Sequence, residues 1–176
     1  MADHQHHQQD RGDRENHHRG DHGGLRIEIV TVSDTRTQKT DESGRIVREL
    51  LECAGHHVTD HSIVADSAEL IRGVVEGAIS RVDVVILTGG TGIAPRDVTI
   101  EAIRPLLDRE IEGFGELFRM LSFNEIGAAA FLSRALAGVV GGKILVALPG
   151  SPAACRLGLE KLLLPELGHV ASLLGL

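Results

Sequence analysis

Aromatic residues are nearly missing from this chain of 176 residues, which has no Trp, no Tyr and only four Phe. Surfaces that bind nucleic acids usually combine stacking aromatic side chains with an excess of positive charge. The formal net charge here is −7 at pH 7. Because both features are lacking, we expect no nucleic-acid partner.

Cysteine and long apolar runs are also scarce. Cys53 and Cys155 lie far apart in the sequence, which predicts neither a disulfide framework nor a zinc site. No apolar stretch reaches the roughly 20 residues that cross a bilayer, and no signal peptide precedes Leu25. We therefore expect a cytoplasmic protein that has no membrane partner.

The first 24 residues differ in composition from the remainder. They contain only Met1 and Ala2 as apolar side chains and hold six of the ten histidines. Such a segment buries too little apolar area to offset its ordering entropy, so residues 1–24 are predicted to be a disordered His-rich tail. Metal binding by these histidines is the alternative. Residues 25–176 are long enough for one domain with a core of its own.

Strand and helix patterns alternate after the tail. Apolar, β-branched runs predict strands at 25–32, 57–64 and 82–87, and helical spacing predicts helices between them and at about 99–107. A β-α-β-α-β order is typical of a parallel sheet with ligands at the carboxyl ends of its strands.

The second half is less regular. A helical stretch opens near residue 113, a Gly-Gly pair predicts a hairpin over 137–148, and Ser151-Pro152 predicts the start of a final helix, which Pro165 restarts or kinks. The predicted class is α/β, a three-layer fold with a mostly parallel, mixed sheet and helices on both faces.

The most informative segment is 87–101, LTGGTGIAPRDVTIE. A strand, a turn with three glycines in four residues and a helix start indicate a phosphate site, because glycine lets backbone N–H groups approach an anion. The segment is not a P-loop, since no Lys-Ser or Lys-Thr follows, and Pro95 stands where a dinucleotide fingerprint needs its third glycine. We expect another phosphate-bearing ligand, with the ionisable Asp97 beside it.

Four ordered segments, LTGGTGIAPRDVT, GFGELFRMLS, LSRALAG and LPGSPAA, closely resemble the MoaB/MogA family of molybdenum cofactor biosynthesis proteins, and VSDTR and TDESG also match. The resemblance covers residues 25–176. It implies a homotrimer or homohexamer that binds molybdopterin and adenylylates its terminal phosphate with Mg-ATP. A partner protein then inserts molybdate into the adenylated product. A non-catalytic carrier or scaffold on the same fold is the alternative.

The resemblance also assigns roles to carboxylates and to the first loop. Asp66 and Asp97 match the family's catalytic positions and are candidate ligands of Mg²⁺, with a helix N-cap as the alternative role for each. Ser33 and Asp34 are expected on the nucleotide side of the site. Turn formation is the alternative for these two.

The other candidates are expected to bind molybdopterin and its phosphate: Gly89, Gly90, Thr91, Gly92, Ser122, Pro149, Gly150, Ser151 and Pro152. Ser151 before Pro152 is also typical of an ordinary helix start. For Ser122 the alternative is a solvated helix position. Ser133 and Arg134 are further candidates for contact with the pterin.

Two further pairs of residues can be explained by a structural role. Phe114 and Phe118 lie four residues apart on one helical face, so we expect them in the core or between subunits and not as a cofactor-stacking pair. Arg96 and Arg119 fit either a phosphate contact or an intersubunit ion pair.

Overall fold

The structure, a computed structural model, describes residues 24–176. The predictions of disorder and of metal binding for the His-rich tail therefore fall outside the described residues, apart from Gly24. Across the described part of the chain, no helix combines the length and the apolarity that crossing a bilayer requires.

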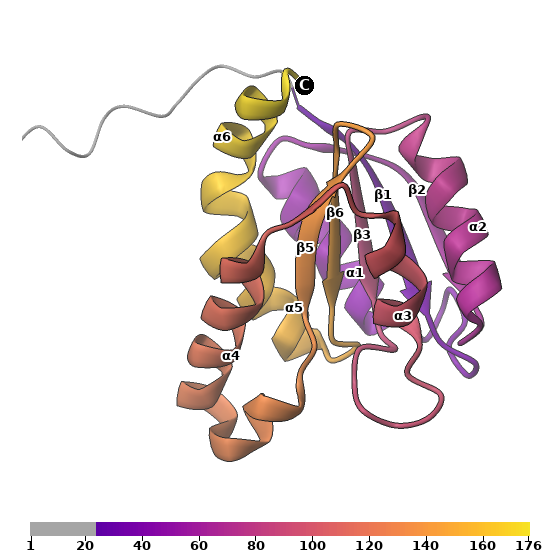
Figure 1. The fold of residues 1–176 in the computed structure, drawn as a ribbon, viewed down its shortest axis with the longest axis vertical. Helices are drawn as coiled ribbons and strands as arrows, with labels where there is room; N and C mark the ends of the chain where they lie inside the picture. Colours follow the sequence, from indigo (N-terminus) through magenta and orange to yellow (C-terminus); the bar gives the residue numbers. More distant parts are fainter. Residues whose placement is uncertain (1–23) are drawn as a thin grey trace, which may run out of the picture.

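Six strands form one mixed sheet in the order β2-β1-β3-β6-β5-β4 (Figure 1). The pairs β1–β2, β1–β3 and β3–β6 are parallel, whereas β5 is antiparallel to both β6 and β4. This arrangement confirms the predicted mostly parallel, mixed sheet. The strand bounds are β1 (Arg26–Val32), β2 (His57–Val64), β3 (Val84–Thr88), β4 (Arg109–Glu110), β5 (Leu136–Val140) and β6 (Lys143–Leu148).

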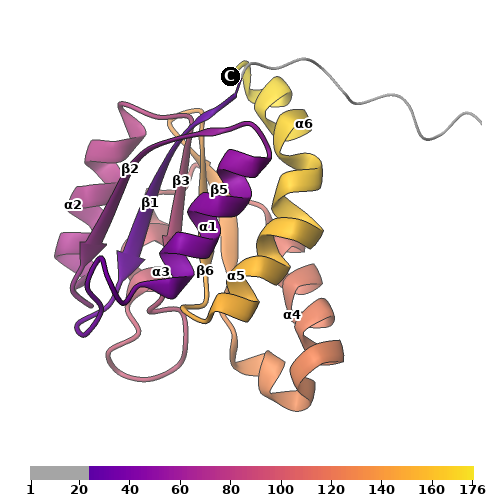
Figure 2. The same ribbon diagram turned by 180° about the vertical axis from the view of Figure 1, so that it is seen from behind.

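Helices cover both faces of the sheet, as predicted. Along β1, Ile27 and Ile29 join one core cluster while Val30 and Val32 join the other, because successive side chains of a strand point to opposite faces. Figure 1 shows α2 and α3 on the near side of the sheet. Figure 2, the opposite view, shows α1 in front of the strands. One face packs against α1 (Glu42–Cys53), α4 (Glu112–Ile126), α5 (Pro152–Gly158) and α6 (Leu164–Leu174), and the other against α2 (Ala68–Ile79) and α3 (Thr99–Ile103).

The parallel strands end at one common edge of the sheet. The chain passes from β1 to β2 on one side and then returns to β3 on the other, so the strand order reverses beside β1. Ligands of open α/β sheets bind at the carboxyl edge near such a reversal. The loops that follow β1, β2, β3 and β6 meet there.

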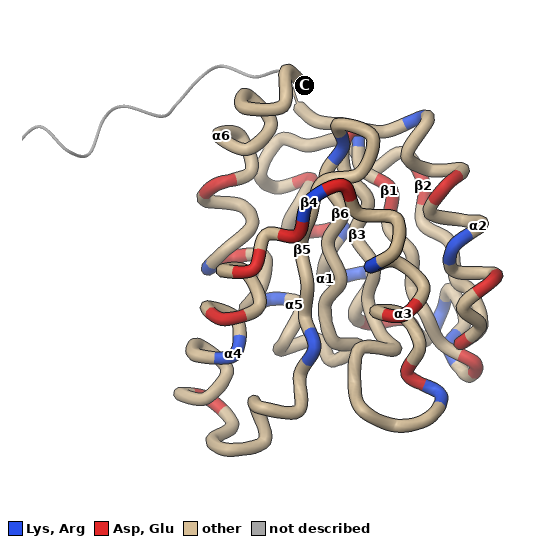
Figure 3. The backbone as a smooth tube through the Cα atoms, viewed as in Figure 1, with Lys and Arg blue, Asp and Glu red and all other residues tan. Residues whose placement is uncertain are grey.

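Figure 3 shows acidic and basic positions interspersed over the helices, while β3 carries no charge.

One proline shortens a predicted helix, and a second interrupts the last helix, as predicted. The predicted helix over 99–107 stops at Ile103 and continues as a 3₁₀ turn, Arg104–Leu106, because Pro105 has no N–H to donate. Pro165 likewise interrupts the last helix, where a π-helical turn, Leu159–Leu163, separates α5 from α6. The sequence did not reveal β4, since two exposed charged residues show no strand periodicity.

Candidate functional site

The glycine loop begins directly at the end of β3. Gly89 has φ of +98°, and a Cβ there would lie 2.3 Å from the carbonyl oxygen of Val32 at the end of β1. Only glycine fits both this backbone conformation and this close approach. Thr99 at the start of α3 closes the loop, since its Oγ1 donates to the Gly89 carbonyl at 2.9 Å and its N–H to the Gly90 carbonyl at 3.1 Å.

A pocket of about 420 Å³ lies between this loop and the loop that follows β6. Its lining includes nine of the residues that the sequence singled out, namely Gly90, Thr91, Gly92, Asp97, Ser122, Ser133, Pro149, Gly150 and Ser151. Its remaining lining comes from Ala154 and an apolar wall of Phe118, Ile126, Ala129, Ala130 and Leu132. The structure thus brings two loops about 60 residues apart, and the helix α4, around one space.

Several of the predicted residues do not line the pocket. Gly89 sits directly behind, where a Cβ on Gly150 would approach its Cα to 3.1 Å. Pro152 occupies the first turn of α5. Ser33, Asp34 and Asp66 lie on the loops that follow β1 and β2.

Asp97 does not cap α3, because Val98 is the N-cap residue and no side chain caps the helix. Its Oδ2 instead accepts a hydrogen bond at 2.9 Å from the N–H of Ala94 within the glycine loop. The same oxygen would lie 2.7 Å from a Cβ on Gly92. The absence of a side chain at Gly92 therefore leaves room for the Asp97 carboxylate beside the pocket.

Asp66 does not cap its helix either, since the N-cap position of α2 is Ser67, without a side-chain capping bond. The N–H of Asp66 donates to Oδ1 of Asp34 at 3.1 Å. Burial raises the pKa of Asp66, and the negative charges of Asp34 and Asp97 raise it further against the opposing effect of Arg96. A Cβ on Gly90 would lie 3.2 Å from Oδ1 of Asp66, so this carboxylate adjoins the glycine loop.

Ser33 forms a turn, which was the predicted alternative to a position on the nucleotide side of the site. Its Oγ accepts hydrogen bonds at 3.2 Å from the N–H groups of Thr35 and Arg36. Ser151 caps α5, and its Oγ accepts from the N–H of Ala154 at 3.2 Å while the residue lines the pocket. The helix-start reading of Ser151 is therefore confirmed, and it is compatible with ligand contact.

Phe114 and Phe118 belong to the core, as expected. Both rings are buried, with their centroids 6.5 Å apart. Phe118 also forms part of the apolar wall of the pocket. Ser122 is 5% exposed, which contradicts a solvated helix position.

A buried polar network supports the loop after β6. The sequence analysis did not predict this network. Oδ2 of Asp41 lies 2.5 Å from Oγ1 of Thr31 and 2.9 Å from Nε2 of His61. These two contacts connect β1, β2 and the start of α1. From the first turn of α1, the Ser43 hydroxyl donates to the Gly150 carbonyl at 2.7 Å. The segment TDESG was the available signal, since Asp and Ser in this spacing are typical of a helix start.

Cys155 lies beneath the same loop, and its thiol donates to the Pro149 carbonyl at 3.3 Å. Burial raises the pKa of this thiol to about 12. Both cysteines of the described chain are free thiols, in agreement with the prediction that neither belongs to a disulfide framework.

We expect Cys155 to resist iodoacetamide at pH 8 in the native protein, because the reactive thiolate is disfavoured and the thiol is covered. The exposed Cys53 serves as the internal control. Mass spectrometry should find one modified cysteine in the native chain and two after unfolding. Rapid native modification of Cys155 would show that the loop after β6 opens in solution.

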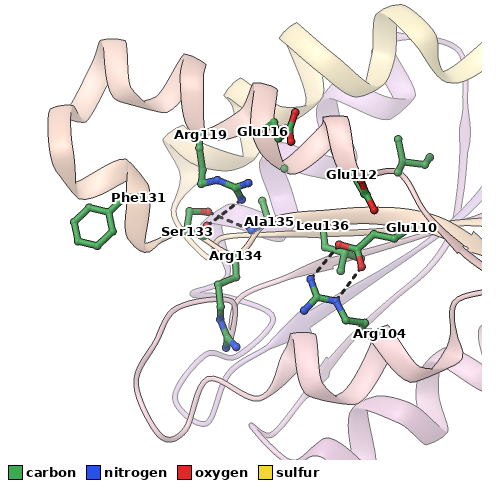
Figure 4. Close-up of a pocket in the computed structure, with 12 residues that line it drawn as sticks. Arg104, Glu110, Glu112, Glu116, Arg119, Phe131, Ser133, Arg134, Ala135 and Leu136 are labelled. Atoms are coloured by element: carbon green, nitrogen blue, oxygen red, sulfur yellow. Dashed lines mark hydrogen bonds and ion pairs between the residues drawn. The ribbon is translucent and has the colours of Figure 1, made fainter.

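A second hollow of about 570 Å³ adjoins the first through Ser133 (Figure 4). Half of the residues that line it are charged, and Arg104 forms a two-pronged ion pair with Glu110 at 2.9 and 3.0 Å. Arg119, which donates to the Ser133 carbonyl at 3.5 Å, also lines it. Of the candidate ligand-binding residues, this larger hollow includes only Arg119, Ser133 and Arg134, whereas nine line the smaller pocket, which is therefore the candidate site.

Within residues 24–176, no three His, Cys, Asp or Glu side chains are grouped as a metal site. A cation here would depend on one or two carboxylates together with the oxygens of a ligand or of water. Mg²⁺ commonly binds phosphate-bearing ligands in this way.

Comparison with known proteins identifies the fold and the family. Residues 28–169 match the family described as "probable molybdopterin binding domain". The chain belongs to the MoaB/MogA family of molybdenum cofactor biosynthesis proteins. The family places it in the pathway that the sequence predicted.

Individual members of the family are similar to this chain in both sequence and fold. Molybdenum cofactor biosynthesis protein B of Bacillus cereus is 55% identical over 149 residues, which cover 83% of this chain and 88% of that protein. A crystal structure of a molybdenum cofactor biosynthesis protein B superposes with a TM-score of 0.84 at 54% identity, covering 86% of this chain and 96% of the other. A MogA structure has a TM-score of 0.77 at 32% identity, with 85% and 99% covered.

Proposed function

We propose that the chain binds molybdopterin in the pocket between the Gly90–Gly92 and Pro149–Ser151 loops and adenylylates its terminal phosphate with Mg-ATP. The observation that carries this proposal is the meeting of both loops around one space with Asp97 at its side. Backbone N–H groups of a glycine-rich loop suit a phosphate. The apolar wall formed by Phe118, Ile126 and Leu132 suits the flat face of a pterin.

The proposed transfer requires no protein nucleophile. A phosphate oxygen of molybdopterin attacks the α-phosphorus of ATP, a new P–O bond forms, and the bond to the bridging oxygen of pyrophosphate breaks. Catalysis then depends on alignment and on neutralising charge at the phosphates. Ser33 and Asp34, next to Asp66 at the same sheet edge, are assigned to the nucleotide side.

Asp66 and Asp97 are the proposed holders of Mg²⁺. Burial is the main cause of the raised pKa of Asp66, and the negative charges of Asp34 and Asp97 add to it; a cation would offset this repulsion. Two carboxylates complemented by phosphate oxygens and water form a suitable ligand set for Mg²⁺. When bound, the ion supplies charge neutralisation at the reacting phosphates.

The test is incubation of the purified chain with molybdopterin and Mg-ATP, with pyrophosphate release followed over time. Stoichiometric pyrophosphate with an adenylated pterin supports the adenylyltransferase. Tight binding of molybdopterin without pyrophosphate identifies a carrier on the same fold. Neither binding nor product would contradict both functions.

Ser151→Ala is expected to weaken molybdopterin affinity on the order of tenfold, which corresponds to one hydrogen bond to a charged group. Loss of the α5 cap should also lower the free energy of unfolding by about 1 kcal/mol. Equilibrium titration and thermal unfolding measure the two effects. Ser67→Ala is the control, because Ser67 occupies an N-cap position without a side-chain bond and lies outside the pocket. Unchanged affinity would remove Ser151 from the binding site.

We also propose that the chain assembles as a homotrimer or homohexamer in the cytoplasm and passes its product to a molybdate-inserting protein. Large apolar side chains outside the pocket lie on α4 and the turn after it, and each is between 47% and 74% exposed: Leu117, Met120, Phe123 and Phe131. Several large apolar side chains exposed on one element are typical of a protein–protein contact. This face of α4 is therefore the proposed subunit contact.

A further inference from the structure

Arg134 holds the glycine loop from outside. Its backbone N–H and its Nε donate to the Thr91 carbonyl at 3.2 and 3.4 Å, and its Nη2 donates to the Asp97 carbonyl at 2.7 Å. Figure 4 shows the side chain extending from its own segment toward the loop between β3 and α3. A single guanidinium thus bridges both ends of the segment 91–97.

Glu101 fixes the guanidinium in this position. Its carboxylate forms an ion pair with Nη1 of Arg134 from the first turn of α3. The Arg134 hydrogen bond lowers the pKa of Glu101 below its usual value, so the pair is ionised at neutral pH. All three side-chain nitrogens of Arg134 therefore have an acceptor, and the side chain has one defined orientation.

The bridged loop has little other support. Ile93 is 68% exposed, and Ala94, Pro95 and Arg96 are exposed as well. The bonds inside the loop run between Ala94 and Asp97, from the Asp97 N–H at 2.8 Å and to the Asp97 carboxylate at 2.9 Å. These bonds shape the turn, whereas the hydrogen bonds that the Thr91 and Asp97 carbonyls accept come from Arg134.

Arg134 also connects two walls of the pocket. It follows Leu132 and Ser133, which line the wall opposite the glycine loop. Its main chain continues directly from that wall, and its side chain holds Thr91 and Asp97 of the other wall. The distance between the walls and the place of Asp97 therefore depend on this one residue.

We propose that Arg134 is a positioning residue, which sets the width of the molybdopterin pocket and places the Asp97 carboxylate by holding the Thr91 and Asp97 carbonyls. The assignment rests on the proposed function for its effect on the reaction, but not for its effect on the loop. It differs from a direct contact with the pterin, because the donors of Arg134 are already used by the loop and by Glu101.

Arg134→Lys tests the proposal, because lysine keeps the charge but cannot bridge two carbonyls with a planar fork of donors. In the ligand-free protein, we expect hydrogen exchange of the amides over 92–99 to accelerate on the order of tenfold, the effect of losing one charge-assisted hydrogen bond. At a temperature where the variant is folded, kcat for adenylylation should fall on the order of tenfold or more, with a smaller change in the KM for ATP.

Arg45→Lys is the matched control, since Arg45 pairs with Glu49 on the exposed surface of α1, which packs on the opposite face of the sheet from α3. It should change neither loop exchange nor kcat. If Arg134→Lys leaves exchange over 92–99 at the wild-type rate, the assignment is wrong. Faster exchange with an unchanged kcat would also overturn the positioning role.

Glu101→Gln provides a second route that is independent of the folding of the Arg134 variant. It removes the charge that orients the guanidinium while leaving every pocket-lining residue in place, and it should accelerate loop exchange in the same direction by a smaller factor. No change in exchange would count against the proposal. Absence of product with the wild-type chain would refute the proposed reaction alone, because loop exchange is measured without substrates.

Discussion

Asp97→Asn is expected to reduce formation of adenylated molybdopterin on the order of 10³-fold, the size typical of removing one charged group from a reaction centre. Asparagine keeps an oxygen that can accept the Ala94 N–H, so the turn of the glycine loop should persist. The expected result is therefore loss of turnover with an unchanged fold. Mass spectrometry of the pterin product and thermal unfolding measure the two properties.

The matched control for this variant is Asp60→Asn. Asp60 is exposed on β2, where its Oδ1 accepts from the N–H of His61, and it should not affect product formation. A large fall in melting temperature for Asp97→Asn would show that the carboxylate charge serves the structure of the loop. Full activity would exclude Asp97 from the reaction.

Gly89→Ala should cause the largest loss of stability of any single methyl addition near the site. The new Cβ would meet the Val32 carbonyl oxygen at 2.3 Å, and the backbone φ of +98° is unfavourable for alanine. Together these effects should lower the free energy of unfolding by roughly 3 kcal/mol. For a chain of this size the melting temperature should fall by about 10 °C.

Gly73→Ala provides the contrast. Gly73 lies within α2, and no atom lies within 4 Å of the position of an added Cβ. Alanine is the better helix former, so this variant should gain about 0.5–1 kcal/mol. Equal melting temperatures for the two variants would mean that the backbone at the end of β3 is not as the structure places it.

The sequence predicted the Gly90 loop from its own residues, whereas the Ser151 loop was assigned to the site by the family resemblance. The structure explains why the two meet, because β3 and β6 are parallel neighbours and their loops leave the sheet at the same edge. The glycine spacing and the Ser-Pro helix start are local signals that need no tertiary information. For this reason most of the residues predicted on these loops line one pocket.

The remaining features depend on contacts that sequence periodicity does not encode. Asp97 and Asp66 both precede helices, which made capping a reasonable alternative, yet neither side chain caps its helix. Arg134 was a candidate for pterin contact, whereas its donors face the loop. The orientation of each of these side chains is decided by segments distant in sequence, as is the position of the wall formed by α4.

The central claim is that molybdopterin binds between the two loops. A crystal structure of the complex tests it most directly. The account predicts the terminal phosphate against the backbone N–H groups of residues 90–92, with the pterin against Phe118 and Leu132. Molybdopterin bound instead in the larger hollow beside Arg104 and Arg119 would contradict the assignment of the site.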